Sequence, residues 1–390
     1  MADFEGVDYY ALDGLLSDEQ KLVRDTVREF VNDKILPVID EHQREGTFPV
    51  EALPGMAAMG LLGANLEGYG LPGLDNISYG LILQELERGD SGLRSFVSVQ
   101  GALCMYPIWR YGSEAQKQQW LPAMGRGDVI ACFGLTEPDA GSDPGAMRTC
   151  AEFDGDEWVL NGVKYWITNG TIAQLAIVWA KTDKGIRGFL VPTDTPGFSA
   201  NKVTGKYSLR VSDTAELVLQ DCRISADNVL PDAEGLKGPL TCLNQARYGI
   251  SWGAVGAAMA CYDEALRYAK NRIAFGRPVA ATQLMQELLV ECVTEITKAQ
   301  LMCLRLGQLK EAGTVTPQQV SMAKRNNVLM ALNTARTCRE ILGGNGILDD
   351  YQSFRHMVNL ESVYTYEGTH QIHTLIVGHD ITGYPAFGER

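Results

Sequence analysis

The sequence predicts a mainly α-helical protein with a β domain in its middle. Three observations lead to this fold class: apolar residues at helical spacing in the first third of the chain, short segments rich in β-branched and aromatic residues from about Val129 to Leu230, and long amphipathic segments after them. The chain has 390 residues, 45% of them hydrophobic, which is enough for two or three domains with large cores.

The first predicted helix begins at Ser17, which makes an S-x-x-Q capping box with Gln20. Apolar residues continue at helical spacing until Pro37, and two further helical segments cover residues 51–64 and 78–95. Residues 68–73 match the spacing G-x-G-x-x-G, but no strand precedes them and no βαβ unit surrounds them, so we interpret them as a glycine-rich loop. We therefore predict a helical first domain, residues 1–130.

The predicted strands of the middle domain are VIACFGLT, WVLNGVKYWIT, LAIVWAK, RGFLVP and AELVLQDCRI. Asn161–Gly162, Asn169–Gly170 and Pro196–Gly197 are the predicted turns between them. No crossover helix separates these segments, which excludes a doubly wound nucleotide-binding fold. We predict a β domain over residues 131–236 and, after the connector GLKGPL, a helical third domain over residues 237–390.

The net charge and the cysteines exclude several classes of protein. A net charge of −14 without a basic cluster argues against a general nucleic-acid or membrane-surface binder. The nine cysteines show no C-x-x-C spacing and lie mostly among apolar residues, which indicates reduced core thiols. The acidic N-terminus resembles neither a signal nor a transit peptide, and no apolar run reaches transmembrane length, so we expect a cytoplasmic protein.

The segment VYTYEGTHQIHTLIVG contains a glutamate, Glu367, for which the residues allow three roles. With His370 it forms an E-x-x-H pair, as in helical di-iron proteins, but those sites need a second such pair. None of the other histidines has a glutamate three residues before it: His42, His356, His373 and His379. We therefore expect no metal site at Glu367. Two interpretations of Glu367 stay open: a carboxylate at a helix N-terminus, and a general base beside Tyr366 and Gly368.

A second segment, ELERGDSGLRS, carries Arg94 into the apolar run that follows it. A buried guanidinium needs an anion, because an unpaired buried charge is costly. The sequence offers Glu87 as a structural partner, and a carboxylate on a bound substrate is the alternative, since arginine binds carboxylates through two parallel hydrogen bonds.

A third segment, FGLTEPDAGSD at residues 133–143, and the WIT of Trp166 to Thr168 contain small, hydroxylated and aromatic residues at predicted strand ends. Backbone amides and an indole in such a place can lie against a planar polar ring. By spacing alone, the first of these segments is only a turn between strands.

Taken together, these segments resemble the acyl-CoA dehydrogenase family. FGLTEPDAGSD, YWITNG, RIAFGRPV, QLMQELL, ILGGNGI and YEGTHQIH stand in the order of that family and at about its spacing, and the resemblance covers nearly the whole chain. ELERGDSGLRS, SVQ, CLNQARYGI and TYEGTHQIHTLIVGHDITG are most similar to the glutaryl-CoA dehydrogenases. The resemblance implies an N-terminal helical domain, a middle β-barrel or sandwich, a C-terminal four-helix bundle, and a homotetramer that holds FAD between domains and subunits.

The resemblance also implies roles for individual residues. The flavin ring would be lined by Phe133, Leu135, Thr136, Ser142, Trp166, Ile167 and Thr168. The rest of the FAD would be contacted by Arg272, Phe275, Gln283, Thr369 and Gln371 and by Glu340, Gly343 and Gly344 of a neighbouring subunit. The substrate would meet Glu87, Arg94, Ser95, Ser142, Leu243, Asn244, Arg247, Tyr366 and Gly368, with Glu367 as the catalytic base.

The implied reaction is the oxidation and decarboxylation of glutaryl-CoA to crotonyl-CoA, with electrons passed to an electron-transferring flavoprotein. One alternative is a dehydrogenase for another short acyl or dicarboxylyl thioester, in which Arg94 is only structural. Another, from a different class, is a non-catalytic flavin-fold protein. Four positions depart from the pattern of the glutaryl-CoA dehydrogenases: Leu93, Phe96, Gln371 and His379.

Overall fold

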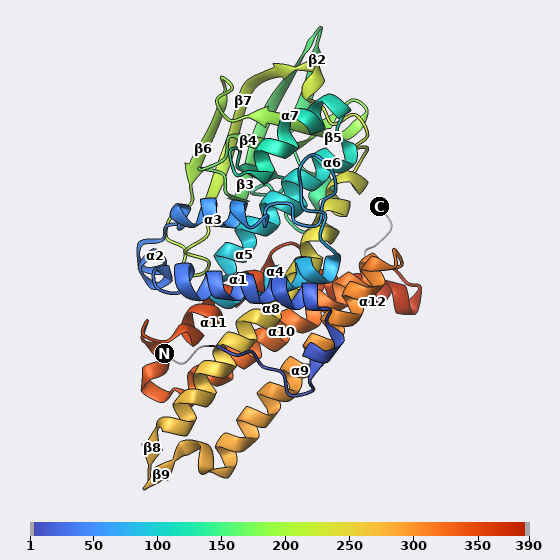
Figure 1. Ribbon diagram of the computed structural model, residues 1–390. Coiled ribbons are helices and arrows are strands. Elements are labelled where there is room, and N and C mark those ends of the chain that lie inside the picture. The colour runs from blue at the N-terminus through green and yellow to red at the C-terminus, as the bar shows by residue number, and fades with distance from the viewer. Residues whose placement is uncertain (1–3, 387–390) are drawn as a thin grey trace.

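The computed structural model describes residues 4–386 and confirms the predicted fold class. A helical region comes first, a β-sheet follows, and long helices complete the chain (Figure 1). The sheet lies at one end of the molecule, and the long helices extend to the other end. The domain boundaries at residues 130/131 and 236/237 stay predictions.

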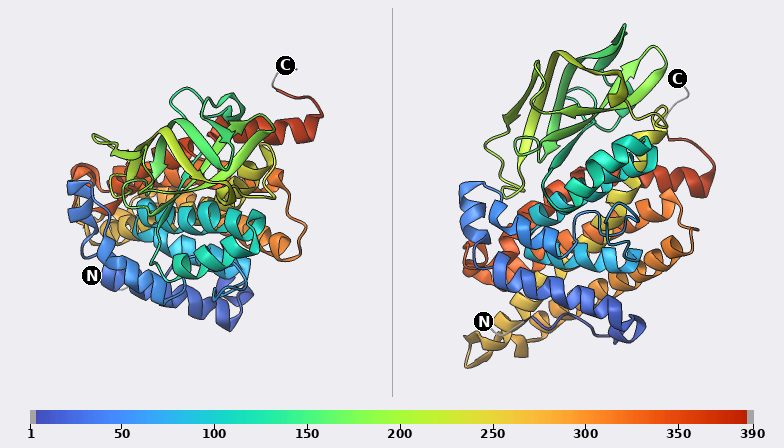
Figure 2. Two further views of the ribbon diagram at one scale, coloured as in Figure 1. Left: turned by 90° about the horizontal axis from the view of Figure 1, so that it is seen from above. Right: turned by 45° about the horizontal axis from the view of Figure 1, so that its top comes forward.

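The N-terminal helices form a layer between the sheet and the C-terminal helices (Figures 1 and 2). The first α-helix carries the predicted capping box, in which the Ser17 hydroxyl accepts from the N–H of Gln20. The α-helices are α1 (Asp18–Phe30), α2 (Ile39–Glu45), α3 (Leu53–Ala58), α4 (Asn76–Gly89), α5 (Ser91–Ser98), α6 (Tyr106–Tyr111) and α7 (Glu114–Gly125). Shorter turns of 3₁₀- or π-helix are η1 (Leu12–Leu15), η2 (Val31–Ile35), η3 (Val50–Ala52) and η4 (Val99–Met105).

The middle region of the described chain is one curled seven-stranded sheet in the order β1-β4-β2-β3-β7-β6, with β5 paired to β4. Its strands are β1 (Ala131–Gly134), β2 (Cys150–Asp154), β3 (Glu157–Thr168), β4 (Leu175–Thr182), β5 (Gly185–Pro192), β6 (Phe198–Lys202) and β7 (Thr214–Ser225). Strand β1 is parallel to β4, whereas β3 is antiparallel to β2 and β7. Short helical turns η5 (Pro144–Ala146) and η6 (Ala226–Asn228) complete it.

The predicted turn at Asn161–Gly162 is wrong, because both residues lie inside strand β3. The pairing of β3 with β7 shifts between Leu160 and Gly162, so the pair marks an irregularity in the ladder. A Cβ on Gly162 would lie 2.4 Å from Thr149 Oγ1, and the glycine has a φ of 150°. Glycine is therefore needed there for a close approach within the sheet and not for a turn.

The C-terminal region contains three long helices and two shorter ones. They are α8 (Lys237–Asn271), α9 (Gln283–Glu311), α10 (Pro317–Ile341), α11 (Gln352–Thr365) and α12 (His370–Thr382). The predicted connector GLKGPL ends inside α8, which already begins at Lys237. A small hairpin of β8 (Ile273–Ala274) and β9 (Arg277–Pro278), followed by η7 (Val279–Ala281), joins α8 to α9, and η8 (Gly343–Ile347) follows α10.

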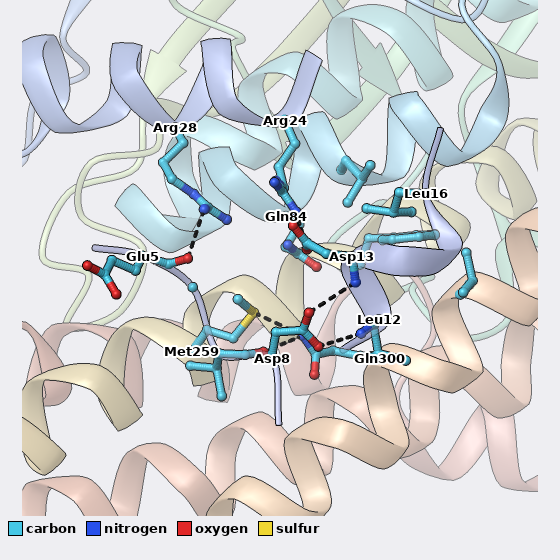
Figure 3. Close-up of a pocket in the computed structure, with 15 residues that line it drawn as sticks. Glu5, Asp8, Leu12, Asp13, Leu16, Arg24, Arg28, Gln84, Met259 and Gln300 are labelled. Atoms are coloured by element: carbon cyan, nitrogen blue, oxygen red, sulfur yellow. Dashed lines mark hydrogen bonds and ion pairs between the residues drawn. The ribbon is translucent and has the colours of Figure 1, made fainter. Parts of the chain in front are cut away.

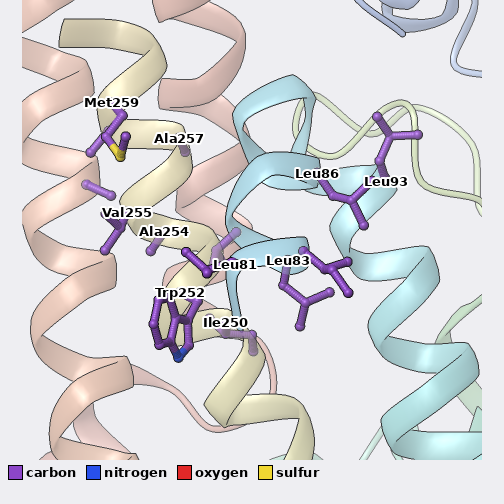
Figure 4. Packing of buried hydrophobic residues seen from close by; sticks show 14 of the residues in the cluster. Leu81, Leu83, Leu86, Leu93, Ile250, Trp252, Ala254, Val255, Ala257 and Met259 are labelled. Carbon is purple, nitrogen blue, oxygen red and sulfur yellow. The ribbon is translucent and has the colours of Figure 1, made fainter. Parts of the chain in front are cut away.

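Helices α4 and α8 cross closely in the core (Figure 4). Leucines of α4 pack against Ile250, Ala254 and Val255 of α8, all of them buried. A Cβ on Gly256 would lie 1.9 Å from the carbonyl oxygen of Gln84, so only glycine permits this approach. The contact brings the polar side chains at the end of α4 against α8.

A small cavity of about 60 Å³ lies beneath the N-terminal segment, between α1, α4, α8 and α9 (Figure 3). Gln300 spans it, and its Nε2 donates to the carbonyl of Val7 at 2.8 Å. Ligand pockets usually measure roughly 300–1,000 Å³. We therefore interpret this cavity as a gap in the packing and not as a ligand site.

Two further expectations concern the surface and the thiols. Over residues 4–386, no helix is both long and apolar enough to cross a membrane. Eight of the nine cysteines are buried and Cys150 is partly buried, and all nine are free thiols, as their apolar neighbours predicted.

Candidate active site

Arg94 is fully buried between α4, α5 and the segment after α11. Its Nε donates to Glu87 Oε2 at 2.6 Å, and its Nη2 donates to the hydroxyl of Tyr366. A Cβ on Gly253 of α8 would lie 2.0 Å from Glu87 Oε2, so the ion pair lies directly against α8. Nη1 of Arg94 has no hydrogen-bond partner within residues 4–386. The structural ion pair is therefore present, and one guanidinium nitrogen is left over for another acceptor.

The junction of α4 and α5 explains why Arg94 lies there. Asp90 ends α4 and caps α5 by accepting from the N–H of Gly92 at 2.7 Å. The same carboxylate accepts from Arg355 Nη1 and Asn359 Nδ2 of α11, each at 2.9 Å. Because α11 leads directly into Tyr366, this network fixes the position of the following loop relative to Arg94.

The loop between α11 and α12 holds Glu367 in the left-handed region, with a φ of 50°. Lys324 Nζ donates to the carbonyls of Tyr366 at 3.0 Å and Gly368 at 2.8 Å. Arg247 Nε donates to the carbonyl of Glu367 at 2.7 Å. A non-glycine residue in this conformation costs about 1–3 kcal/mol unless its surroundings fix it. Here, cationic side chains bind three consecutive carbonyls of the loop.

Glu367 is partly buried, and three cationic side chains surround its carboxylate. Burial raises its pKa above the usual range, and the positive charges of Arg94, Lys324 and Arg247 oppose that rise. Its Oε2 is shielded from solvent and has no hydrogen-bond partner in the described part of the chain. The residue is not a helix cap, since Thr369 caps α12 by accepting from the N–H of Ile372. An unpaired carboxylate of raised pKa fits a general base.

The nearby histidines do not turn toward Glu367 as ligands. The ring of His370 stacks on Tyr364, with ring centroids 4.7 Å apart. His373 is fully buried, and burial lowers its pKa to about 3, so its ring is neutral. Within residues 4–386, no group of three or more histidine, cysteine, aspartate or glutamate side chains is placed to hold a metal ion.

A surface for a planar ring lies where β1 and β3 end. The N–H of Tyr165 donates to the carbonyl of Thr136 at 2.8 Å, which brings the two predicted segments together. The ladder between β3 and β7 is irregular between Lys164 and Ile167. There Trp166 has a φ of 63° and a 58% exposed side chain. An exposed indole suits a flavin ring, with Thr168 two residues further along the chain and Thr136 bonded to the neighbouring Tyr165. Phe133, Leu135 and Ile167 are buried.

The comparisons with known proteins agree with this geometry. Three family profiles match: "Acyl-CoA dehydrogenase, N-terminal domain" over residues 17–128, "middle domain" over 132–222 and "C-terminal domain" over 233–382. The human mitochondrial short-chain specific acyl-CoA dehydrogenase is 36% identical, and the match covers 95% of this chain and 92% of that protein.

Two solved structures are also similar. A glutaryl-CoA dehydrogenase from Mycobacterium smegmatis, in complex with FADH2, is 50% identical with a TM-score of 0.97, covering 98% of this chain and 99% of the other. Butyryl-CoA dehydrogenase from Megasphaera elsdenii is 32% identical with a TM-score of 0.90, covering 94% and 98% of the two chains.

The chain belongs to the acyl-CoA dehydrogenase family. Its activity is therefore acyl-CoA dehydrogenation. Most of the residues predicted around the substrate of this dehydrogenase lie together: Glu87, Arg94, Asn244, Arg247, Tyr366, Glu367 and Gly368. Ser95 is buried on α5, Leu243 is partly buried on α8, and Ser142 is exposed in the loop after β1.

The residues predicted for the rest of the FAD lie elsewhere in the dehydrogenase chain. Arg272, Phe275 and Gln283 belong to the hairpin and the start of α9, at the opposite end from the sheet (Figure 1). Glu340, Gly343 and Gly344 are exposed near the same end, where Asn345 donates to the hydroxyl of Tyr268 at 3.2 Å. A single chain does not bring these residues to Trp166, so their contact with FAD stays a prediction for a second subunit. Gln371 is exposed on α12.

The two departures near Arg94 both pack into the N-terminal core. The ring of Phe96 stacks on Phe48, with centroids 4.7 Å apart, and is fully buried in the N-terminal core. Leu93 is buried in the same core cluster and packs beside Gly89. Gln371 and His379, the other two departures, are exposed on α12.

The site also contains a residue that the sequence reasoning missed. Lys324 is 1% exposed and lies on the buried face of α10, which also carries Val320, Asn327 and Ala331. A lysine at helical spacing within an apolar stripe was the available signal, because such a charge needs a buried partner.

We expect Glu87→Gln to lower the free energy of unfolding by about 3–5 kcal/mol, because it leaves the buried Arg94 without its contacting anion. Urea unfolding followed by circular dichroism measures the change. Glu157→Gln is the control: its partner Arg223 lies 3.4 Å away on the surface, where pairs contribute up to about 1 kcal/mol. Equal losses of unfolding free energy in the two variants would show that the buried Glu87–Arg94 pair stabilises the protein no more than a surface pair.

Proposed function

We propose that this acyl-CoA dehydrogenase oxidises and decarboxylates glutaryl-CoA to crotonyl-CoA, with FAD as its cofactor. The proposal rests on two buried polar atoms of opposite charge, one on Arg94 and one on Glu367, that have no hydrogen-bond partner in the described residues. These atoms are Arg94 Nη1 and Glu367 Oε2, and each charge acts on the other. A dicarboxylyl thioester offers an anion for the first group and an α-proton for the second.

Glu367 is the proposed base for the α-proton of the thioester. That proton is weakly acidic, so the oxygen of the developing enolate needs hydrogen-bond donors in place. The N–H of Glu367 takes part in no hydrogen bond among residues 4–386 and is free to donate to this oxygen. Gly368 adds no side chain that would block the thioester, and the ring of Tyr366 lies 5.6 Å from the guanidinium of Arg94 and 6.0 Å from Lys324 Nζ.

FAD, when bound against Trp166 and the strand ends, supplies an acceptor for the β-hydrogen and its two electrons. Arg94 holds the terminal carboxylate until the α,β-double bond has formed. Loss of CO2 then leaves its bonding electrons on the γ-carbon, and the proton that Glu367 took from the α-carbon is available to this crotonyl anion. The chain thus removes and returns one proton at a single carboxyl group.

The similarity to the Mycobacterium smegmatis glutaryl-CoA dehydrogenase supports the substrate, since half of the residues are identical over nearly the full length of both chains. The second candidate is a dehydrogenase of plain short-chain thioesters. The human short-chain relative and the existing pairing of Arg94 with Glu87 favour it, because a paired arginine does not require a substrate anion.

Two partners follow from the proposal. Electrons leave to an electron-transferring flavoprotein. A homotetramer supplies the second subunit that the FAD contacts near Arg272 require. The exposed apolar residues at that end, Ile273, Phe275 and Leu284, support a contact between subunits.

The base is tested with Glu367→Gln. We expect this variant to bind FAD and acyl-CoA but to lose anaerobic bleaching of the flavin. In the wild type, the bleaching rate falls as the pH drops through the raised pKa of Glu367, because only the ionised carboxylate accepts the proton. Stopped-flow absorbance over a pH series measures both. Bleaching of the Gln variant at the wild-type rate would contradict the assignment.

The anchor is tested with the double variant Glu87→Gln/Arg94→Met, which removes both members of the buried pair and so leaves no lone charge. We expect kcat/KM to fall about 10–100-fold more for glutaryl-CoA than for butyryl-CoA, the worth of roughly 1.5–3 kcal/mol for a hydrogen bond to a charged group. Equal losses for the two substrates would remove the anchor role and favour the second candidate.

A further inference from the structure

Lys324 is a buried cation that the proposed chemistry does not use. It lies in the middle of α10, 1% exposed, and no carboxylate of the described residues is within 4.0 Å of its Nζ. Its two hydrogen bonds go to the carbonyls of Tyr366 and Gly368, the residues on either side of Glu367. Burying a charge without a paired acid costs free energy, so we expect the contacts of Lys324 with this loop to have a function.

The backbone of the loop indicates this function. Glu367 and Gly368 both have positive φ values, 50° and 94°. Glutamate avoids this region, so the conformation persists only where the surroundings impose it. By binding the carbonyls of Tyr366 and Gly368, a single ammonium group holds the peptide plane that leads into Glu367 and the plane that follows Gly368, while Arg247 holds the plane between them.

The charge has a second effect. The groups around the carboxylate are Glu87 and Tyr79 of α4, Arg94 of α5, Arg247 of α8, Tyr366 of the loop and His373 of α12. Arg94 already pairs with Glu87 at 2.6 Å, and His373 is neutral. The positive charge of Lys324 therefore acts on Glu367 without a contacting acid of its own.

We propose that Lys324 is a positioning residue that fixes Glu367 in its left-handed conformation and, through its charge, keeps the Glu367 carboxylate ionised. The inference rests on the proposed role of Glu367 as the base. Burial lowers the pKa of Lys324 to about 7, while Glu367 opposes this, so the two groups titrate as neighbours.

The test is Lys324→Met in the FAD-loaded enzyme. Loss of the charge removes one of the three positive groups that lower the pKa of Glu367, so we expect that pKa to rise by about one unit. The rise is read without turnover, from the pH dependence of the carboxyl band in infrared spectra that Glu367→Gln abolishes in each background. We expect flavin bleaching by acyl-CoA to slow roughly 100-fold near neutral pH, as for a misplaced catalytic group, and the deficit to shrink as the pH rises.

Lys310→Met is the matched control. It removes another lysine of lowered pKa from the same helical region, one that donates to Gln245 Oε1 and not to the loop. We expect it to leave the carboxyl titration unchanged. If Lys324→Met does not fold, Lys324→Gln keeps a donor without the charge and carries the same expected rise.

An unchanged carboxyl titration in a folded Lys324 variant, or a loss of bleaching equal at every pH, would overturn the inference. The bleaching of Glu367→Gln, measured beside it, separates the two claims. If that variant still bleaches, the base assignment fails, while the infrared titration continues to report on Lys324.

Discussion

The buried ion pair of Glu87 and Arg94 is the constraint on which the site depends. It lies where α4, α5 and α8 meet, and Gly253 is a glycine because the carboxylate occupies the space of a side chain. A guanidinium in such a place is stable only while every neighbour stays close. Because Arg94 also donates to the hydroxyl of Tyr366, the ion pair fixes the position of the loop that contains Glu367.

The loop in turn combines opposing electrostatic effects. Burial disfavours the charge of Glu367, and three cations on separate helices favour it. A base for a weakly acidic α-proton needs such a balance: its pKa must be raised enough to accept a proton, yet it must be ionised when the substrate arrives. Lys324 and Arg247 meet this need through hydrogen bonds to the backbone, which leave the carboxylate free to reach the substrate.

Much of the fold could be predicted from local patterns. The capping box of Ser17, five of the seven strands of the sheet and the long C-terminal helices follow from spacing alone. Strands β2, CAEFD, and β6, FSANK, contain no β-branched residue, so the sequence pattern does not predict them. The dipeptide Asn161–Gly162 favours a turn by its sequence, whereas the close packing of Gly162 against Thr149 decides its place in a strand.

The site was predictable only in part. Glu367, Tyr366 and Arg94 were found because their residue types suit the chemistry, and the structure brings them together. The left-handed backbone of Glu367 and the bonds from Lys324 depend on contacts across 43 positions of sequence, from residue 324 to residue 367, which no local pattern records. The residues around Arg272 and Gly343 lie away from Trp166 within one chain, so their contact with FAD stays a prediction for a second subunit.

In the proposed reaction, Arg94 and Glu367 act on the two ends of one dicarboxylyl thioester. Anaerobic mixing of the FAD-loaded protein with a panel of acyl-CoAs tests it most directly, with flavin absorbance and released CO2 followed together. We expect glutaryl-CoA to bleach the flavin fastest and to release one CO2 for each molecule oxidised. Faster bleaching by butyryl-CoA, with no CO2 from glutaryl-CoA, would contradict it.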